Sequence, residues 1–367
     1  MALKTYYENQ NISFKLGWQE GNFIEKDEKM IKNQVTIKDI ARELGISPST
    51  VSKALKGHPD ISSATKKAVR DLVEKWNYKP DPIALSLQSG QSKTIGVIVP
   101  EIIHYFFSTV IGGIGDLAYD SGYQVMFCQS NESYKREVNA VATLLSSRVD
   151  GILVSVTKET ENFDHLRKIQ DSGIPLVFFD RICTEIESDR VVVDDEEGAY
   201  KAVRHLIAVG CRNIVHLSGP PNLMIGKYRK EGYIRALKEN NFPVTERNII
   251  RCDTADDARL IIPGFLSGNN IPDGFFAVND LTAAETMKIV KRYGFNVPED
   301  IAIVGYTSGQ IASLTDPPLS SVDQHGYIMG REAVKLLIDR LEKDYNAPFQ
   351  TKVIKTELVI KGSSLRQ

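Results

Sequence analysis

Short polar side chains follow one face of a helix that we predict from Ser47 to about Lys56. Val51, Ala54 and Leu55 are expected to point inward. The outer face then carries Ser49, Thr50, Ser52 and Lys53. Hydroxyl and ammonium groups can hydrogen-bond to base edges, and side chains this short let a helix lie deep in a major groove. These residue types therefore predict a surface that reads double-stranded DNA.

Two neighbouring helices would hold this polar face in place. Thr36 and Asp39 have the spacing of a capping box, and Gly45 would end the first helix in a left-handed conformation. Ser47 and Pro48 then have the types that begin a second helix. The inward residues expected on the first helix are Ile37, Ile40, Ala41 and Leu44, and those on a third helix over 63–77 are Val69, Leu72, Val73 and Trp76. A small helical bundle with no role in DNA binding would show the same pattern, so this segment alone leaves both interpretations open.

Charged and amide side chains also occur where predicted strands of the remaining chain end. Asp180 and Arg181 follow one strand, Asn279 and Asp280 follow another, and Arg229 lies on the helix after the segment HLSGPP. In an open parallel sheet, ligands meet the carboxyl ends of the strands. We therefore expect these side chains to line a small-molecule cleft. Two alternatives stay open: an internal ion pair between Asp180 and Arg181, and an Asp280 that only caps the next helix.

The elements that would position these residues alternate between strands and helices from residue 94 onward. The expected strands are 94–99, 124–128, 151–155, 176–180, 190–193, 213–218, 249–251, 274–278 and 301–306, and the expected helices are 107–120, 198–209, 224–240, 281–293 and 326–341. This order is typical of the α/β class and predicts two doubly wound parallel sheets. Two such lobes facing each other would enclose a cleft at the ends of their strands.

Residues 80–93 have the composition of a linker. Pro80, Pro82 and Gly90 interrupt regular structure. The apolar stretch 83–87 between them is too short to form a stable helix alone, but it could fold when packed against a partner. In the alternative interpretation, the leucines of this stretch simply dock on the rest of the chain. The linker therefore separates a helical head from an α/β body.

Several segments resemble, in order and spacing, those of the lactose-repressor/galactose-repressor family of bacterial transcription regulators. They are VTIKDIARELGISPSTVSKAL, NYKPDPIALSL, IGVIVP, FFDR, HLSGP, VND and PPLSSVDQ, and the resemblance covers residues 35 to about 361. It implies a helix-turn-helix head over 35–79, a hinge helix within 80–93 and a periplasmic-binding-protein-like body over 94–361. One lobe would comprise 94–193 plus 325–350, and the other 194–324 plus 351–361. Residues 1–34 would form a disordered extension and 362–367 a tail.

The resemblance also implies roles for particular residues of the head and hinge. The head would contact base edges and phosphates through Ser47, Pro48, Ser49, Thr50, Ser52, Lys53, Ser62, Thr65 and Tyr78. In the hinge helix, Leu87 matches a leucine that enters the minor groove, and Ala84 matches a small residue that lets two hinges approach. The resemblance thus implies a homodimer on a pseudo-palindromic operator.

In the body, the resemblance implies an effector site between the lobes. Asp180, Arg229 and Asn279 match residues that hydrogen-bond the effector, and Phe106 and Phe107 match an aromatic wall. Hydroxyl groups need both donors and acceptors, and C–H faces stack on aromatic rings, so a sugar or sugar phosphate would suit this set. The implied protein is a repressor, or less often an activator, whose operator affinity changes when the effector binds.

Some residues depart from the family's pattern. Thr307 and Ser308 stand where members commonly carry two acidic residues, and Thr254 falls near a common aromatic position. In the head, Lys53 replaces a frequent arginine or histidine, and residues 81–82 replace ones that often touch phosphate. Any particular member's sugar is therefore not expected to carry over, and base discrimination by Lys53 is expected to be softer, since lysine is a point charge.

The charge distribution agrees with a head that meets phosphates. The 367 residues carry a formal net charge of −2. Residues 30–93 hold eleven Lys and Arg against six Asp and Glu, whereas residues 94–367 hold thirty against thirty-six. A basic head on an acidic body suits phosphate contacts at one end only. A solvated surface would also explain so small an imbalance.

Cysteine spacing and hydropathy narrow the class of protein further. The four cysteines show no CxxC spacing, and the six histidines show no metal spacing. No apolar run reaches the length of a membrane span, and the first residues lack the pattern of a signal peptide. We therefore expect a cytoplasmic protein without a metal site or a membrane partner. Residues 1–29 fall outside the resemblance, and Met30 is the more favoured start of the chain.

One motif is typical of enzymes. Residues 113–118 match the GxGxxA dinucleotide fingerprint, but they fall inside a predicted helix instead of at a strand-to-helix turn. There is no Walker loop, no GxSxG segment and no nucleophile with an adjacent base, so we expect neither an enzyme nor a cofactor. The rival hypothesis is a transport-type sugar-binding protein, which would share the two lobes. That class predicts a signal peptide and no helical head.

Overall fold

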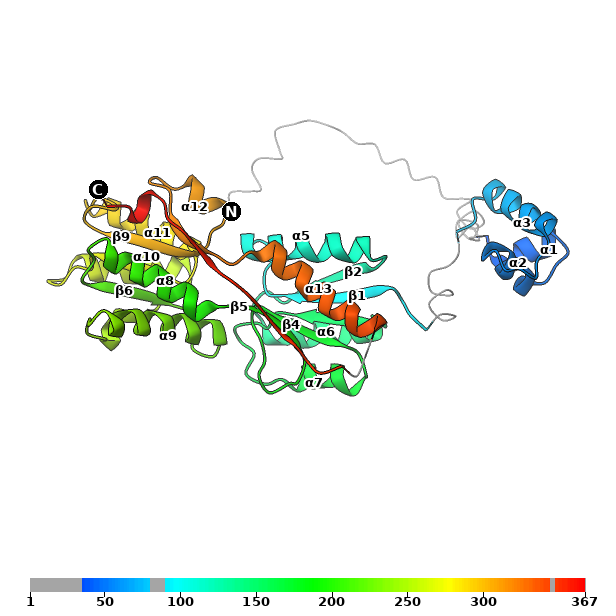
Figure 1. Cartoon of the computed structure of the whole chain (residues 1–367), viewed down its shortest axis with the longest axis horizontal. Helices are drawn as coiled ribbons and strands as arrows, with labels where there is room; N and C mark the ends of the chain where they lie inside the picture. Colours follow the sequence, from blue (N-terminus) through cyan, green and yellow to red (C-terminus); the bar gives the residue numbers. More distant parts are fainter. Residues whose placement is uncertain (1–34, 80–89, 344–346, 367) are drawn as a thin grey trace, which may run out of the picture. The chain divides into compact units, whose positions relative to one another are not determined.

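The computed structural model describes residues 35–79, 90–343 and 347–366 of the chain (Figure 1). The chain divides into two compact units, one up to Leu85 and the other from Ser86 onward. We call the described part of the first unit the head and that of the second unit the body. The predicted extension over 1–34 and residues 80–89 of the predicted hinge segment 80–93 lie outside the described residues.

The head is a bundle of three helices, α1 (Ile37–Glu43), α2 (Pro48–Leu55) and α3 (Ser63–Lys75). The predicted capping box is confirmed: the side chains of Thr36 and Asp39 each accept a hydrogen bond from the other's backbone N–H. Ser47 caps α2 by accepting from the N–H of Thr50 at 3.1 Å. Gly45 has φ of +64°, the left-handed conformation predicted for the turn between α1 and α2.

A small apolar core joins the three helices. Ile40, Val51 and Val69 are fully buried, one from each helix, and Trp76 packs against them. The prediction that Leu55 points inward is wrong, because this side chain is 36% exposed. Leu55 is the last residue of α2 and lies beyond the shared core.

The body contains two α/β lobes, each built on a six-stranded sheet. In lobe one the strand order is β11-β5-β4-β3-β1-β2, and all neighbours are parallel. Its strands are β1 (Thr94–Val99), β2 (Gln124–Gln129), β3 (Gly151–Val154), β4 (Leu176–Phe179), β5 (Asp189–Val193) and β11 (Thr351–Ile354). Its helices are α5 (Tyr105–Asp120), α6 (Tyr134–Ser146), α7 (Asp164–Asp171) and α13 (Gly326–Glu342). The inner strands β3 and β4 are buried throughout, as expected for a parallel sheet covered on both faces.

Lobe two has the strand order β12-β10-β9-β8-β6-β7. Its strands are β6 (Ile214–Ser218), β7 (Ile249–Arg251), β8 (Gly274–Ala277), β9 (Ala302–Thr307), β10 (Ser320–Asp323) and β12 (Glu357–Val359). Its helices are α8 (Asp195–Ala208), α9 (Met224–Glu239), α10 (Ala255–Leu266), α11 (Asp280–Arg292) and α12 (Gln310–Leu314), with 3₁₀ turns at Glu246–Asn248 and Gly362–Ser364. The predicted class of two doubly wound sheets is confirmed, and β12 adds an antiparallel edge to the second sheet.

The described chain crosses between the lobes at three places: from β5 to α8, from β10 to α13, and from β11 to β12. Asp194 joins two of these crossings, because its carboxylate accepts a hydrogen bond from the N–H of Thr356 at 2.6 Å. The predicted return to lobe two at residue 351 is corrected by four residues. β11 pairs with β5 in lobe one, so the chain returns only after Ile354. Three of the four residues of β11 are exposed, so its sequence has no apolar pattern that predicts which sheet the strand joins.

Helices α5 and α13 lie against each other in lobe one (Figure 1). A Cβ atom on Gly113 would lie 2.1 Å from the carbonyl oxygen of Tyr327, and one on Gly330 would lie 2.1 Å from that of Val110. Residues 113–118 are inside α5, as predicted. Gly113, the first glycine of the dinucleotide-like motif, therefore allows α5 and α13 to pack closely.

Candidate functional site

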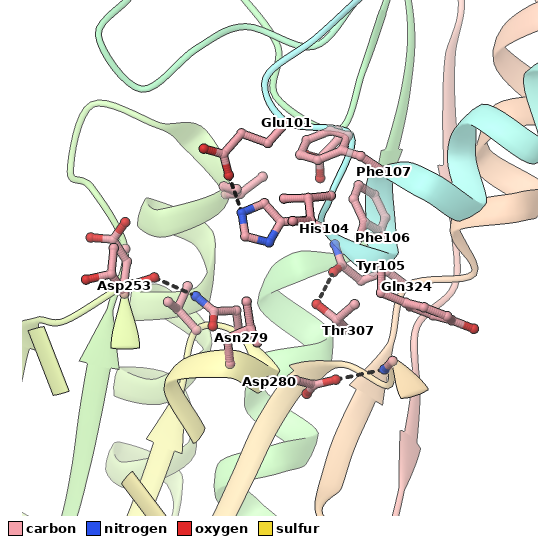
Figure 2. Close-up of a pocket in the computed structure, with 18 of the residues that line it drawn as sticks. Glu101, His104, Tyr105, Phe106, Phe107, Asp253, Asn279, Asp280, Thr307 and Gln324 are labelled. Atoms are coloured by element: carbon pink, nitrogen blue, oxygen red, sulfur yellow. Dashed lines mark hydrogen bonds and ion pairs between the residues drawn. The ribbon is translucent and has the colours of Figure 1, made fainter. Parts of the chain in front are cut away.

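A cavity of about 640 Å³ lies between the two lobes of the body (Figure 2). Its walls include the residues that directly follow several strands and the first turns of the helices after them. All seven side chains expected to bind an effector line it: Phe106, Phe107, Asp180, Arg181, Arg229, Asn279 and Asp280. The structure thus brings them to one place, and their role in binding stays a prediction.

Phe106 and Phe107 form an apolar wall at the start of α5 (Figure 2). Their rings meet edge to face with centroids 5.3 Å apart, and both side chains are buried. The guanidinium carbon of Arg181 lies 5.6 Å from the centre of the Phe107 ring, within cation–π range. A wall of this kind can stack against the C–H face of a ring-shaped ligand.

Asp180 supplies a buried carboxylate directly after β4. The residue is 6% exposed and has φ of +58°, a left-handed conformation that aspartate adopts more readily than most residues. Burial raises the pKa of its carboxyl to about 7, although the charge of Arg181 opposes this shift. Within the described residues no donor forms a hydrogen bond to this carboxylate, and the nearest cationic atom is Arg181 Nε at 3.8 Å.

Arg181 is paired mainly with Glu132. Its Nη1 donates to both carboxylate oxygens of Glu132 at 2.9 Å, closer than the 3.8 Å contact to Asp180. Glu132 also accepts from the backbone N–H of Lys158 at 2.9 Å. The internal pair considered for Asp180 and Arg181 is therefore secondary, and the strong salt bridge runs between Arg181 and Glu132.

Arg229, on α9, is fixed by groups of lobe two. Its Nε donates to Asp195 at 2.7 Å, and its Nη1 donates to the carbonyl of Val278 at 2.7 Å. The guanidinium carbon lies 3.7 Å from the centre of the Tyr306 ring. Burial is the largest single effect and opposes the charged form, but Asp195, Tyr306 and Asp180 together outweigh it and raise the pKa of Arg229. Arg229 therefore reaches the cavity as a charge that is already balanced.

Asn279 and Asp280 also have partners inside lobe two. Asn279 Oδ1 caps α11 by accepting a backbone N–H at 2.8 Å, and its Nδ2 donates to the carbonyl of Asp253 at 2.8 Å (Figure 2). The Asp280 carboxylate accepts from the N–H of Gly309 at 2.7 Å and from the hydroxyl of Ser321 at 2.5 Å. The capping role considered for Asp280 thus belongs to Asn279, and Asp280 ties together three segments of lobe two.

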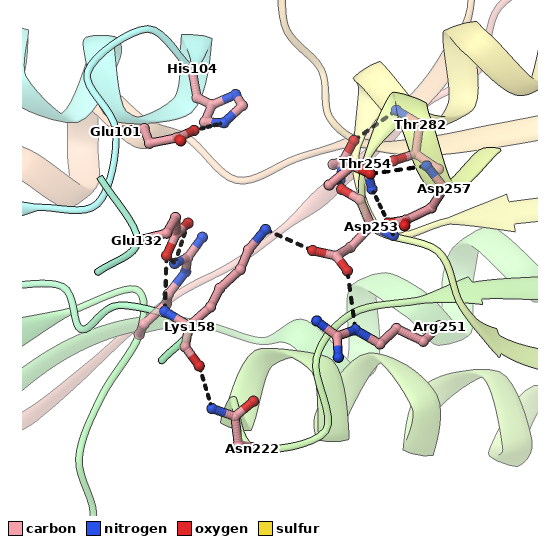
Figure 3. Close-up of polar contacts among 12 residues, drawn as sticks. Glu101, His104, Glu132, Lys158, Asn222, Arg251, Asp253, Thr254, Asp257 and Thr282 are labelled. Carbon is pink, nitrogen blue, oxygen red and sulfur yellow. Dashed lines mark hydrogen bonds and ion pairs between the residues drawn. The ribbon is translucent and has the colours of Figure 1, made fainter. Parts of the chain in front are cut away.

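One contact on the cavity wall was not predicted (Figure 3). Lys158, in the loop after β3 of lobe one, donates its Nζ to Asp253, which follows β7 of lobe two, at 2.7 Å. Asn222 of lobe two donates to the carbonyl of Lys158 at 2.6 Å. Both charged residues follow strands, so the strand-end rule that identified Asp180 could have found them. The sequence carries no sign, however, that these two loops meet.

Gln324 is a second residue that was not predicted to bind the effector. It lies between β10 and α13, is buried, and lines the cavity. Its Oε1 accepts from the hydroxyl of Thr307 at 3.3 Å (Figure 2). Its amide nitrogen has no partner among the residues that the structure describes. Thr254 and Thr307, two departures from the family's pattern, also line the cavity.

The residues of the head that are expected to contact DNA lie along α2, at the start of α3 and, for Tyr78, after the end of α3. Ser47, Pro48, Ser49, Lys53 and Ser62 are exposed, while Thr50, Ser52, Thr65 and Tyr78 are partly buried. The Ser47 hydroxyl lies 2.7 Å from that of Ser49 and 2.8 Å from that of Thr50, so the start of α2 displays a cluster of hydroxyls. Ala84 and Leu87 of the predicted hinge lie outside the described residues.

The described residues show no metal centre. They contain no group of three or more His, Cys, Asp or Glu side chains that could hold an ion. All four cysteines are free thiols. None of the helices in these parts of the chain combines the length and the apolar character needed to cross a bilayer.

Comparisons with known proteins match both units. A family model described as bacterial regulatory proteins, lacI family, matches residues 36–81, and one described as a periplasmic binding protein-like domain matches residues 203–364. The structure of a lac repressor dimer bound to operator and the anti-inducer ONPF shares the fold, with a TM-score of 0.80 at 23% identity, over 91% of this chain and 100% of that chain. A complex of the transcriptional regulator CelR with cellobiose has a TM-score of 0.69 at 26% identity, over 90% of this chain and 99% of that chain.

A curated relative matches across the head and the body together. The HTH-type transcriptional repressor PurR of Vibrio atlanticus (strain LGP32) is 34% identical over 317 residues. The match covers 84% of this chain and 93% of the relative. With a helix-turn-helix head and a two-lobed body in the same order, the chain belongs to the lacI family of bacterial regulatory proteins.

Proposed function

We propose that this protein is a transcriptional repressor whose affinity for an operator is set by a small ligand held between the lobes of its body. The observation that carries the proposal is the combination, in one chain, of a capped helix-turn-helix and a cavity at the strand ends of two facing lobes. Repressor function in the PurR relative supports it. A protein that binds an operator would be located on the bacterial nucleoid, in the cytoplasm.

Helix α2 is the element that we expect to enter the major groove. Ser49, Thr50 and Lys53 would meet base edges there. Phosphates would be held by Ser47, Ser52, Ser62, Thr65 and Tyr78, with Pro48 shaping the start of α2. The hydroxyls of Ser47 and Ser62 accept hydrogen bonds from their own helices. Each also shares a hydrogen bond with a neighbouring hydroxyl, so a phosphate oxygen would accept a proton from the hydroxyl cluster as a whole.

The protein is proposed to act as a homodimer on a pseudo-palindromic operator. The lac repressor structure is a dimer on its operator, which supports this arrangement. Two hinge segments would then lie side by side, with Ala84 allowing the approach and Leu87 entering the minor groove. Such a wedge kinks the duplex most easily at a flexible pyrimidine–purine step.

The ligand of the body is proposed to be sugar-like. The cavity combines an aromatic wall with a buried carboxylate and an amide donor, which suits a molecule rich in hydroxyl groups. The CelR–cellobiose complex supports this class of ligand. Rotation of one lobe against the other on ligand binding would alter the spacing of the two hinges. The shift in operator affinity would equal the difference in ligand affinity between the two states.

Selection of binding sites from a randomised duplex library tests the proposal. The full-length protein is used at about physiological salt, where non-specific phosphate binding is suppressed. We expect enrichment of a pseudo-palindrome with a pyrimidine–purine step at its centre. The enriched duplex then serves as the probe for ligand effects on binding. Failure to enrich any sequence, with and without candidate sugars, would contradict the proposed function.

A further inference from the structure

We infer that the cavity selects an uncharged, hydroxyl-rich ligand and rejects phosphate esters and other anions. This inference rests on the proposed function and narrows its ligand class. The sequence left both sugars and sugar phosphates open, and the pairing of charges on the cavity wall decides between them.

Each arginine and lysine on the cavity wall already has a carboxylate partner. The pairs are Arg181 with Glu132 at 2.9 Å, Lys158 with Asp253 at 2.7 Å, and Arg229 with Asp195 at 2.7 Å. The side chains of these three carboxylates are 18%, 6% and 4% exposed, respectively. A phosphate that displaced one of these carboxylates from its cation would leave that carboxylate without its partner, which is strongly unfavourable. A phosphate that bound beside an intact pair would lie next to the negative charge of the carboxylate.

The remaining charges make an anion still less favourable. The carboxylates that line the cavity are those of Glu101, Glu132, Asp180, Asp253 and Asp280, against the cations of Lys158, Arg181 and Arg229. His104 lines the rim and contacts Glu101 (Figure 2). Arg181 Nε has no hydrogen bond within the described residues and is buried too deeply to reach a ligand. The Nη2 groups of Arg181 and Arg229 also have no hydrogen bond among the described residues, but each belongs to a guanidinium that is already paired with a carboxylate. An anion in the cavity would therefore meet an excess of negative charge and only cations that a carboxylate already balances.

Asp180 is the carboxyl group on the wall that has no hydrogen-bond donor among the described residues. It is buried, and no donor within the described residues satisfies its carboxylate. A ligand hydroxyl would supply the missing hydrogen bond, since a carboxylate is an acceptor and a hydroxyl can donate. A buried carboxylate left without any donor is costly, so this pairing should contribute strongly to affinity.

A cationic ligand fits less well than a neutral one. A cation placed against Asp180 would also lie near the guanidinium of Arg181, whose Nε is 3.8 Å from the carboxylate. Arg229 adds a second positive charge that acts on the same carboxylate. Gln324 offers a neutral amide donor on the wall, and Phe106 and Phe107 offer an apolar face. Donors, acceptor and apolar wall together match a neutral polyhydroxylated ring.

Calorimetric titration of the full-length protein without DNA tests the inference. The ligands are a panel of neutral mono- and disaccharides, each paired with its phosphate ester, together with glucosamine and inorganic phosphate. We expect at least one neutral sugar to bind, its ester and glucosamine to bind at least about tenfold more weakly, and inorganic phosphate to give no binding heat. An ester that binds as tightly as its parent sugar would overturn the inference, as would a panel without any neutral binder.

A conservative variant links the result to Asp180. We expect Asp180→Asn to bind the neutral sugar about tenfold more weakly and to narrow the gap between that sugar and its ester. The control variant Glu161→Gln makes the same charge change at an exposed position outside the cavity and should leave both affinities unchanged. If Asp180→Asn keeps the wild-type ratio of affinities for the neutral sugar and its ester, Asp180 does not select the ligand. The two proposals fail separately. If the wild-type protein selects no operator, the proposed function is contradicted, whereas the sugar titration is done without DNA and tests only the ligand class.

Discussion

Asp180 makes the body less stable as the pH rises. Its pKa of about 7 means that the folded chain holds a proton that the unfolded chain, with an ordinary pKa near 4, releases earlier. Between these two pH values the folded state binds more protons than the unfolded state, so the free energy of unfolding falls as the pH increases. Above pH 7 both states are ionised and the full penalty is present. The residue proposed to meet the ligand is thus held in the site at an energetic cost.

Asp180→Asn should remove this pH-dependent penalty. An amide has no charge to desolvate, and asparagine tolerates the left-handed φ of this position. We expect the variant to melt about 2 °C or more above the wild type at pH 8, with a difference that grows from pH 5 to about pH 7 and then levels off. Circular dichroism across this range measures the melting temperatures, with Glu161→Gln as the control. A difference that does not change with pH would contradict the raised pKa.

Lys53 is the exposed cation of α2 and tests how the head reads DNA. If it meets a base edge, Lys53→Ala should weaken binding to the selected operator by about 1–3 kcal/mol and relax the preference at one base position. Fluorescence anisotropy with single-base operator variants measures both effects. Lys67→Ala, at an exposed position on α3, is the matched control. Equal losses on the operator and on unrelated DNA would instead assign Lys53 to a phosphate contact.

At the scale of elements, two glycines of α5 test whether the dinucleotide-like motif serves the packing of this helix. A Cβ on Gly113 would overlap the backbone of α13, whereas one on Gly115 has no atom within 4 Å. We expect Gly113→Ala to lower the free energy of unfolding by about 1–3 kcal/mol, because α5 and α13 must separate. Gly115→Ala should raise it by about 0.5–1 kcal/mol, since alanine favours a helix. Urea denaturation gives both values. Equal effects would mean that the close contact of the two helices is not tight.

Elements with local signals could be predicted from the sequence, and those that depend on distant partners could not. The caps of α1 and α2 lie within three residues of the groups they bind, so Thr36 and Ser47 were identified correctly. The edge strands β11 and β12 were not identified, because four and three residues are too few to show an apolar alternation and their pairing is fixed by β5 and β10. The prediction for Leu55 was wrong for the same reason, because the burial of a residue at the end of a helix depends on which distant segment covers it.

At the scale of the whole molecule, the location of the site was more predictable than its contacts. Parallel strands bring their carboxyl ends to one edge, which placed Asp180 and Asn279 on the cavity, and family resemblance added Phe106 and Arg229. The pairing of Arg181 with Glu132 joins segments 49 residues apart, and that of Lys158 with Asp253 joins segments 95 residues apart. No local pattern encodes such distances. The charge balance that decides the ligand class therefore became visible only in the folded body.

The Lys158–Asp253 salt bridge connects the two lobes beside the cavity and should favour their closed arrangement (Figure 3). If ligand is held in the closed state, loss of this pair raises the population of open molecules and lowers apparent affinity in proportion. We expect Lys158→Met, which keeps the apolar stem, to release bound sugar about three- to tenfold faster in stopped-flow measurements. Lys135→Met, at an exposed position on α6, is the control and should match the wild type. A wild-type release rate in Lys158→Met would mean that the remaining contacts alone keep the lobes closed.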